Sequence, residues 1–388
     1  MARAFAVVLF PLAIACTGDR GASRGVDITR DSAGIALLAM DGVVMCEECR
    51  LTVELDARIG DREGRGLAEA EWAALDYDDS TGLYGVVWAN DESAEVDLYD
   101  RTGRYIRSIG RRGQGPGEFA RAPYQFDLRD GTLTVMNYPG DDWIVYRDDG
   151  TLVDSWRNPE PRAYEFVQLS PDTALLVVLG RRNEDLPRPL VSISSRRTVG
   201  AMPGSVFTHD DPNSPFATPL IAAGSAPGTV AVGWRDQLLI REWSTDGELL
   251  RVLRGEPQGF PVLNAPREAD DPPPNLLASI AFDRRGRLWT LTNVPADTWA
   301  EHRDGLREFI GGRTGPVGVP VTLINSLPRS TAPRLDVFDL ERGLHLGSWV
   351  SDARRVGLVE RDGELAAYTV ELDDALEPSL RVYRVEFP

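Results

Sequence analysis

The feature that most constrains this 388-residue chain is a β-hairpin that recurs along it. Short stretches of alternating apolar and polar residues are joined by turns that contain Asp and Gly. Alternation with a period of two is typical of half-buried strands, and Gly supplies the positive φ that tight turns require. In four copies of the hairpin the turn glycine is Gly103, Gly150, Gly247 or Gly343. A second type of hairpin precedes this one, so we expect a repeating unit of four strands.

The spacing of the turns predicts the number of units, each of which has the size of a propeller blade. Gly150 follows Gly103 by 47 residues, and the next interval has room for two blades. The interval before Gly343 contains only one inner hairpin, which indicates one blade with a long insertion at residues 293–334. The expected blades are 72–110, 122–157, 164–200, 217–254, 276–350 and a sixth from Arg354 onwards.

The sixth blade lacks a fourth strand at the C-terminal end of the chain. Residues 51–60 end in Ile-Gly, as the outermost strand at 105–110 does, so we expect them to supply the missing strand. The prediction is an all-β protein whose residues 51–388 form a single six-bladed β-propeller, closed by this N-terminal strand. Within the insertion, the spacing of Trp299, Leu306 and Ile310 favours one short helix across the channel mouth, and disorder is the alternative.

The first fifteen residues have the character of a signal peptide. An apolar run from Phe5 to Ile14 is too short to span a bilayer, and Ala13-Ile14-Ala15 matches a cleavage pattern. Because Cys16 follows, the stretch is similar to a bacterial lipobox, although Ala13 stands where Leu is usual. We expect lipidation of Cys16, with residues 16–50 as a tether and lead-in segment. Ordinary secretion with a free Cys16 is the alternative.

The other two cysteines, Cys46 and Cys49, are separated by two glutamates. In an exported protein such a pair usually forms a disulfide, which is the favoured interpretation. An unpaired or dynamic pair is a second possibility. A zinc site is the least favoured, because zinc needs about four ligands and no His lies nearby.

The stretch from Gly110 to Phe119, followed by Phe126-Asp127 and Val145-Tyr146, resembles an NHL repeat. It is similar to repeats in six-bladed propeller lipoproteins of bacteria that are also described as TolB-like. The resemblance implies the propeller fold, whereas its relatives include binding modules, lactonases and lyases, so it implies no single function. The glycines at 110–117 lack the Lys and the helix of a phosphate-binding loop, which favours a tight crossover between blades.

Charge and motifs restrict the partners. A net charge of −18 argues against nucleic acid as a partner. His209, His302 and His345 are far apart and share no metal-binding spacing, so we assign no catalytic residue, no metal and no cofactor. We expect a monomer that contacts the membrane only through its lipid anchor, on the periplasmic side, or that is secreted.

The favoured function is a binding or scaffold module at the cell envelope, whose partner is an unknown protein or small molecule at the channel face. The alternative is a metal-dependent hydrolase or lyase of the lactonase type, for which calcium is the expected ion. Loops between second and third strands and crossovers between blades emerge on one face, where a polar funnel is the default site. The candidate ligand-binding residues there are Arg112, Asn137, Arg181, Trp234, Arg235 and Asn293.

Overall fold

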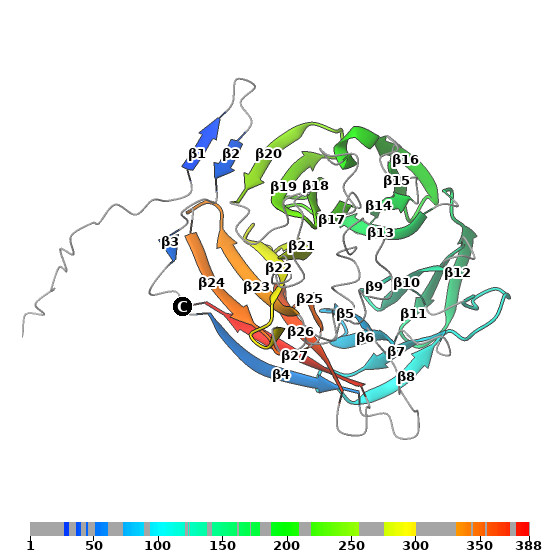
Figure 1. Cartoon of the computed structure of the whole chain (residues 1–388). Helices are drawn as coiled ribbons and strands as arrows, with labels where there is room; N and C mark the ends of the chain where they lie inside the picture. The colour runs from blue at the N-terminus through cyan, green and yellow to red at the C-terminus, as the bar shows by residue number, and fades with distance from the viewer. Residues whose placement is uncertain are drawn as a thin grey trace, which may run out of the picture.

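Twenty-seven strands and one short 3-10 helix, η1 (Gly204–Phe207), are present in the described part of the chain. The computed structural model describes residues 27–30, 36–39, 44–45, 51–60, 73–88, 94–120, 123, 125–137, 142–160, 163–170, 172–178, 188–208, 219–255, 275–299, 331–342, 344–353, 355–372 and 378–387. The strands form six sheets arranged in a ring, as Figure 1 shows. In each sheet, antiparallel strands follow one another from the centre of the ring to its rim.

The first three blades follow the chain order without interruption. Blade 1 contains β5 (Ala73–Asp78), β6 (Leu83–Trp88), β7 (Val96–Tyr99) and β8 (Tyr105–Ile109). Blade 2 contains β9 (Phe126–Arg129), β10 (Thr132–Asn137), β11 (Asp142–Arg147) and β12 (Leu152–Arg157). Blade 3 contains β13 (Ala163–Ser170), β14 (Thr173–Val178), β15 (Arg188–Ser192) and β16 (Arg197–Met202).

The other three blades each include a segment from the N-terminal part of the chain. Blade 4 contains β17 (Pro219–Ala223), β18 (Thr229–Trp234), β19 (Gln237–Ser244) and β20 (Leu249–Arg254). Blade 5 contains β21 (Leu276–Phe282), β22 (Leu288–Pro295), β23 (Thr331–Asp339) and β24 (Leu344–Val350). Blade 6 contains β25 (Arg355–Arg361), β26 (Glu364–Leu372), β27 (Pro378–Glu386) and, outermost, β4 (Thr52–Ile59).

The predicted six-bladed fold and its closure are confirmed. β4 pairs antiparallel with β27, with Ile59 opposite Leu380, so the ring is closed by a strand from the other end of the sequence. Blade 5 carries an insertion between β22, which ends at Pro295, and β23, which begins at Thr331. The predicted bounds of 293–334 were too wide, because residues 293–295 and 331–334 still pair in the β22–β23 ladder. The predicted helix falls on residues that follow Trp299, and these lie outside the described residues.

Three further strands were not predicted. β1 (Asp27–Arg30) and β2 (Ala36–Ala39) form a hairpin, and β2 pairs parallel with the outer strand β20 of blade 4. β3 (Val44–Met45) pairs parallel with β24 of blade 5. The lead-in therefore runs past the rims of two blades before it enters blade 6, as the blue strands in Figure 1 show. Pairing satisfies backbone groups that an open edge would leave exposed.

The core lies between neighbouring blades, and the described residues form one apolar cluster at each of the six blade interfaces. Large side chains anchor these clusters, including Trp88, Trp143, Trp234 and Trp289, each at most 2% exposed. Burial of a large apolar side chain is worth roughly 1.5–3 kcal/mol. Each blade is therefore stabilised mainly by its two neighbours, which makes closure of the ring essential.

The glycine-rich crossover from blade 1 to blade 2 is occupied by its own side chains. Phe119 is fully buried, and its ring lies where a side chain at Gly110 would be. The Glu118 carboxylate accepts a hydrogen bond from the Gly115 N–H at 2.8 Å and pairs with Arg111. This internal carboxylate takes the place that a phosphate would need, so the crossover interpretation is supported over the phosphate-loop one.

Candidate functional site

A cavity of about 250 Å³ lies where the innermost strands of blades 1, 2 and 3 approach one another. We call it the central cavity. Its walls come from β5, β9, β13 and the adjoining residue Gln125, with one residue of β26 in blade 6. Its polar and aromatic lining residues include Asp76, Gln125, Asp127, Phe166, Gln168 and Tyr368.

Asp76 and Asp127 occupy matching places on the first strands of two successive blades. Asp76 Oδ2 accepts a hydrogen bond of 2.7 Å from the Leu128 N–H in β9, and Oδ1 accepts one of 2.9 Å from the Tyr77 N–H. Asp127 Oδ1 pairs at 3.2 Å with Arg129, whose guanidinium is 43% exposed. Asp76 therefore links blade 1 to blade 2 and is positioned by backbone rather than by a cation.

The environment of this pair favours protonation. Burial, followed by the charge of Asp127, raises the pKa of Asp76 to about 7, even though the two backbone N–H groups act in the opposite direction. Burial also raises the pKa of Asp127, against the lowering effect of Arg129. Two neighbouring carboxyl groups in a poorly solvated site resist carrying two charges. Around neutral pH the pair can hold a proton, which lets it both donate and accept hydrogen bonds.

Two glycines allow aromatic rings to reach the cavity wall. A Cβ at Gly85, opposite Asp76 in the sheet, would lie 2.7 Å from a ring carbon of Phe126. A Cβ at Gly357 would lie 2.2 Å from the ring of Tyr368, its partner on β26. Tyr368 lies over the inner strand of blade 6, its hydroxyl 3.4 Å from the Ala73 carbonyl. Burial raises the pKa of this hydroxyl to about 12, so it stays a neutral donor.

Two amides complete the polar lining. Gln125 Oε1 accepts a hydrogen bond of 2.6 Å from the Phe166 N–H, which connects blades 2 and 3. Gln168 Nε2 donates one of 2.6 Å to the Ser170 carbonyl in its own blade. The cavity thus combines carboxyl and amide groups with aromatic walls. Such a lining suits a small polar ligand, because a few convergent polar groups fix its orientation while apolar walls exclude water.

Asn137 and Arg112, two of the predicted ligand-binding residues, lie at the crossover between blades 1 and 2. Asn137 is 5% exposed; its Oδ1 accepts from the Ala120 N–H at 3.0 Å, and its Nδ2 donates to the Glu118 carbonyl at 3.3 Å. Arg112 is exposed and forms a backbone bridge with Phe119. The amide of Asn137 therefore has a structural role in fixing the crossover.

Trp234, Arg235 and Asn293 lie in blades 4 and 5. Trp234 is fully buried, with Arg241 stacked 5.1 Å from its ring. Arg235 is half-buried, and its carbonyl accepts from the Leu277 N–H at 2.9 Å. Asn293, near the end of β22, is half-buried. The predicted residues thus come from different blades, and ligand binding by them stays a prediction. Arg181, Cys16, Cys46 and Cys49 lie outside the described residues.

A serine, a histidine and an aspartate meet in blade 5, in an arrangement that differs from a catalytic one. Ser348 Oγ donates to Asp336 Oδ1 at 2.5 Å, and His345 Nε2 lies 3.2 Å from both Ser348 Oγ and that same Asp336 oxygen. A nucleophilic serine needs one imidazole nitrogen for itself and the other for the acid. In blade 1 the cross-strand pair Asp97 and Ser108 makes the matching contact at 2.6 Å, which indicates a structural device of the blade.

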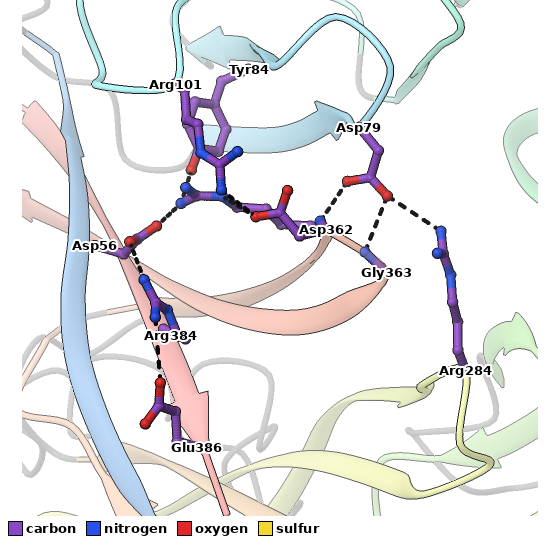
Figure 2. Close-up of polar contacts among 10 residues, drawn as sticks. Asp56, Asp79, Tyr84, Arg101, Arg284, Asp362, Gly363, Arg384 and Glu386 are labelled. Atoms are coloured by element: carbon purple, nitrogen blue, oxygen red, sulfur yellow. Dashed lines mark hydrogen bonds and ion pairs between the residues drawn. The ribbon is translucent and has the colours of Figure 1, made fainter.

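The polar side chains at the junction of blades 5, 6 and 1 form a second charged region, most of which is labelled in Figure 2. We call it the closure network, and its members are Asp56, Asp79, Tyr84, Arg101, Arg284, Glu360, Arg361, Asp362, Arg384 and Glu386. Arg361, 8% exposed, bonds to Asp56 on β4 and donates to the Tyr84 hydroxyl at 2.5 Å. Arg384 also bonds to Asp56, at 3.0 Å. The closing strand is therefore held by two arginines on one carboxylate.

The network continues across the turns of the three blades. Asp79 in blade 1 accepts hydrogen bonds from the backbone of Asp362 at 2.5 Å and of Gly363 at 3.1 Å in blade 6. Arg284 in blade 5 reaches Asp79 at 3.3 Å and Glu360 at 2.7 Å. Arg101 in blade 1 pairs with Asp362 at 2.6 Å. Charges of opposite sign thus bridge every junction near the point where the ring closes.

Neither charged region was predicted from the sequence. Asp76 in Leu-Asp-Tyr and Asp127 in Phe-Asp-Leu stand at the same place in their hairpins, which was an available signal for the cavity pair. The closure network offers no comparable signal, because Asp56 and Arg361 are 305 residues apart. Within the described residues, no three His, Cys, Asp or Glu side chains are grouped to hold a metal ion. No helix of the described part is long and apolar enough to cross a membrane.

Comparisons with known proteins identify the fold. No family model matches the chain, and no curated protein matches it. Among solved structures it is similar to a Bacteroides fragilis protein provisionally described as exported, with a TM-score of 0.54 and 9% identity over 90% of this chain and 99% of that one. It is also similar to a member of the DUF4221 family from Bacteroides vulgatus, with a TM-score of 0.54 and 9% identity over 88% of this chain and 99% of that one.

At this level of identity the likeness shows a shared fold alone. The protein is a six-bladed β-propeller with a polar cavity among its inner strands. The fold that the NHL and TolB-like resemblance implied is confirmed, and membership of that family stays a prediction.

Proposed function

We propose that this protein is an exported, lipid-anchored propeller that binds a small polar ligand in its central cavity at the bacterial cell envelope. The observation that carries the proposal is the placement of Asp76 and Asp127 in that cavity, where desolvation raises the pKa of both carboxyl groups. Carboxyl groups with strongly shifted pKa values in a concave site are candidates for function.

The polar groups and aromatic walls of the central cavity support a binding role. The alternative, a metal-dependent hydrolase or lyase, would need several oxygen ligands around one ion. The serine and histidine of blade 5 are arranged for structure. The NHL and TolB-like resemblance of residues 105–150 is compatible with binding, because such propellers include binding modules.

The envelope location is supported by the signal-peptide character of residues 1–15 and by Cys16. The Bacteroides fragilis structural neighbour, provisionally described as exported, agrees with it. Metabolic labelling with a radioactive fatty acid tests the anchor. We expect label in the wild-type chain and in the Cys46→Ser control but none in Cys16→Ser. Label that persists in Cys16→Ser would refute lipidation at this residue.

Ligand binding is tested by thermal unfolding of purified protein with a panel of small sugars, polyols and amines. We expect at least one compound to raise the unfolding temperature of the wild type and to lose its effect in Asp127→Asn. The matched control is Asp130→Asn, a turn residue whose φ of 51° suits Asn. If no compound acts, or if the two variants respond alike, the cavity is not the binding site.

A further inference from the structure

A second cavity, of about 420 Å³, lies at the seam between blades 6 and 1, away from the central cavity. β4 provides Leu55, Asp56, Ala57 and Arg58, the β7–β8 turn provides Arg101 and Thr102, and the end of β25 provides Arg361. We call it the seam pocket. Its lining contains three guanidinium groups and one carboxylate, in a chain whose net charge is −18. A local excess of positive charge on an acidic protein favours an anion.

The three arginines differ in how their charges are used. Arg361 lies deepest, bonded to Asp56 and Tyr84, with Asp362 at 3.5 Å. Figure 2 shows Arg101 directed toward Asp362, with which it pairs at 2.6 Å. Arg101 remains 59% exposed and has further N–H donors beyond this one ion pair. The side chain of Arg58 is exposed and makes no hydrogen bond or ion pair with any residue that the structure describes.

The backbone brings these arginines together and resists their separation. Gly103, at φ 88°, packs so closely on β4 that a Cβ there would lie 1.9 Å from the Arg58 carbonyl oxygen. The turn that carries Arg101 is therefore seated on the strand that carries Arg58. Across the sheet, Arg58 faces Arg381, which pairs with Glu371 at 2.8 Å and offers no acid to Arg58. Like charges held close to one another are stabilised when an anion lies between them.

We propose that the seam pocket binds an oxyanion ester, a small organic molecule that carries a phosphate or sulfate group, through Arg58 and Arg101. Guanidinium groups match such oxygens with paired hydrogen bonds. The pocket is larger than a bare phosphate needs, and Leu55, 56% exposed, offers an apolar wall for the organic part. This site is independent of the central cavity, so either can fail without the other.

Isothermal titration at low ionic strength tests the proposal with three probes: inorganic phosphate, inorganic sulfate and glycerol 3-phosphate. We expect saturable binding of glycerol 3-phosphate to the wild type and about tenfold weaker binding in Arg58→Gln, the loss of one charge-assisted contact. Arg101→Gln should show a similar loss. The control is Arg107→Gln on β8, whose guanidinium contacts the Asp149 carbonyl at 2.8 Å and is absent from the pocket lining.

A flotation assay with vesicles that contain phosphatidylglycerol separates the two sources of such an ester, and it uses a chain that starts at residue 17 so that the proposed lipid anchor at Cys16 does not contribute. Binding of glycerol 3-phosphate identifies a soluble ligand, and vesicle binding that is lost in Arg58→Gln identifies a lipid headgroup. Arg58 makes no described contact that its replacement could break, so a folding defect is not expected in that variant. No binding by any probe, or equal binding by Arg58→Gln and Arg107→Gln, overturns the proposal.

Discussion

The central cavity and the closure network both contain partly or fully buried carboxyl groups, but the two regions differ in whether cations neutralise these groups. In the closure network, Asp56 is bonded to Arg361 and Arg384, so its charge is matched. In the central cavity, Asp76 is held by two backbone N–H groups, and the neighbouring charge with the largest effect on its pKa is another acid, Asp127. Paired carboxylates secure the ring. A buried acid held by backbone groups without an ion pair, as Asp76 is, raises the free energy of the folded state, which is typical of sites kept for a ligand.

The same contrast explains where charges are found in the propeller. The closure network holds β4 to β27 inside blade 6, where two strands from opposite ends of the chain pair without a turn between them, and it continues to the turns of blades 1 and 5. Oppositely charged groups give this junction a specific geometry at little net cost near the surface. Blades 1 and 2 are each formed by one continuous segment of the chain and need no such support. Their inner acids, Asp76 and Asp127, are therefore available for another purpose.

The largest expected effect comes from removing the closing strand. A chain that starts at residue 61 lacks β4, which exposes the edge of β27 and removes the buried Ala57 and Ile59. We expect it to lose cooperative unfolding in urea, monitored by tryptophan fluorescence. A chain that starts at residue 51 keeps β4 and should still unfold cooperatively. Equal behaviour of the two truncations would contradict the role of β4 in closure.

Arg361→Ala is the next most severe change. It leaves Asp56 partly buried with only the more exposed Arg384, and breaking a buried pair from one side costs about 3–5 kcal/mol. The matched control is Arg284→Ala, whose partners lie at the surface and whose loss should cost at most about 1 kcal/mol. Urea unfolding measures both free energies. A difference between them of less than about 1 kcal/mol would show that burial does not distinguish the two arginines.

A smaller effect concerns the pH dependence of stability. Burial and the charge of Asp127 raise the pKa of Asp76 to about 7 in the folded state, while two backbone N–H groups and the charge of Arg129 lower it. Its stabilising contribution is therefore complete below pH 4 and is lost as the pH rises through 7. We expect the free energy of unfolding to fall by about 2–3 kcal/mol from pH 5 to pH 8 through this group.

Asp76→Asn should remove most of that pH dependence, whereas Asp130→Asn in the neighbouring turn should keep it. Urea unfolding at pH 5, 6.5 and 8 provides the comparison. Because Asp76 accepts two backbone hydrogen bonds, the Asn variant is expected to be less stable at pH 5. A wild-type stability that rises between pH 5 and pH 8 would contradict the raised pKa.

Much of the fold could be predicted because its signals are local. Turn glycines at Gly103, Gly150 and Gly247 do adopt positive φ, between 84° and 88°, and period-two strands flank them. Gly343 lies outside the described residues. Even the closure by β4 left a trace, since its Ile-Gly end repeats the end of β8. In contrast, the parallel addition of β2 and β3 depends on which rims stay open in the folded ring, and hairpin patterns do not contain that information.

The candidate site was less predictable because polarity in a sequence does not say how a polar group is used. Asn137 is the last residue of β10, but both polar atoms of its side-chain amide are hydrogen-bonded to the backbone of the crossover. Trp234 is covered by its own blade interface. In the sequence, Asp76 is indistinguishable from a solvated acid next to a turn. Only the fold shows that β9 lies beside β5 and donates a backbone hydrogen bond to Asp76. The distinction between a structural and a functional polar residue therefore rests on tertiary neighbours.

The protonation of Asp76 tests the central claim most directly. Carboxyl carbon resonances of ¹³C-labelled aspartates can be followed by NMR from pH 3 to pH 9, with the Asp76 signal assigned by its absence in Asp76→Asn. The account predicts a midpoint for this signal near pH 7, raised by burial and by Asp127. A midpoint below pH 5, in the ordinary range of solvated aspartates, would contradict an unpaired acid kept in the central cavity for a ligand.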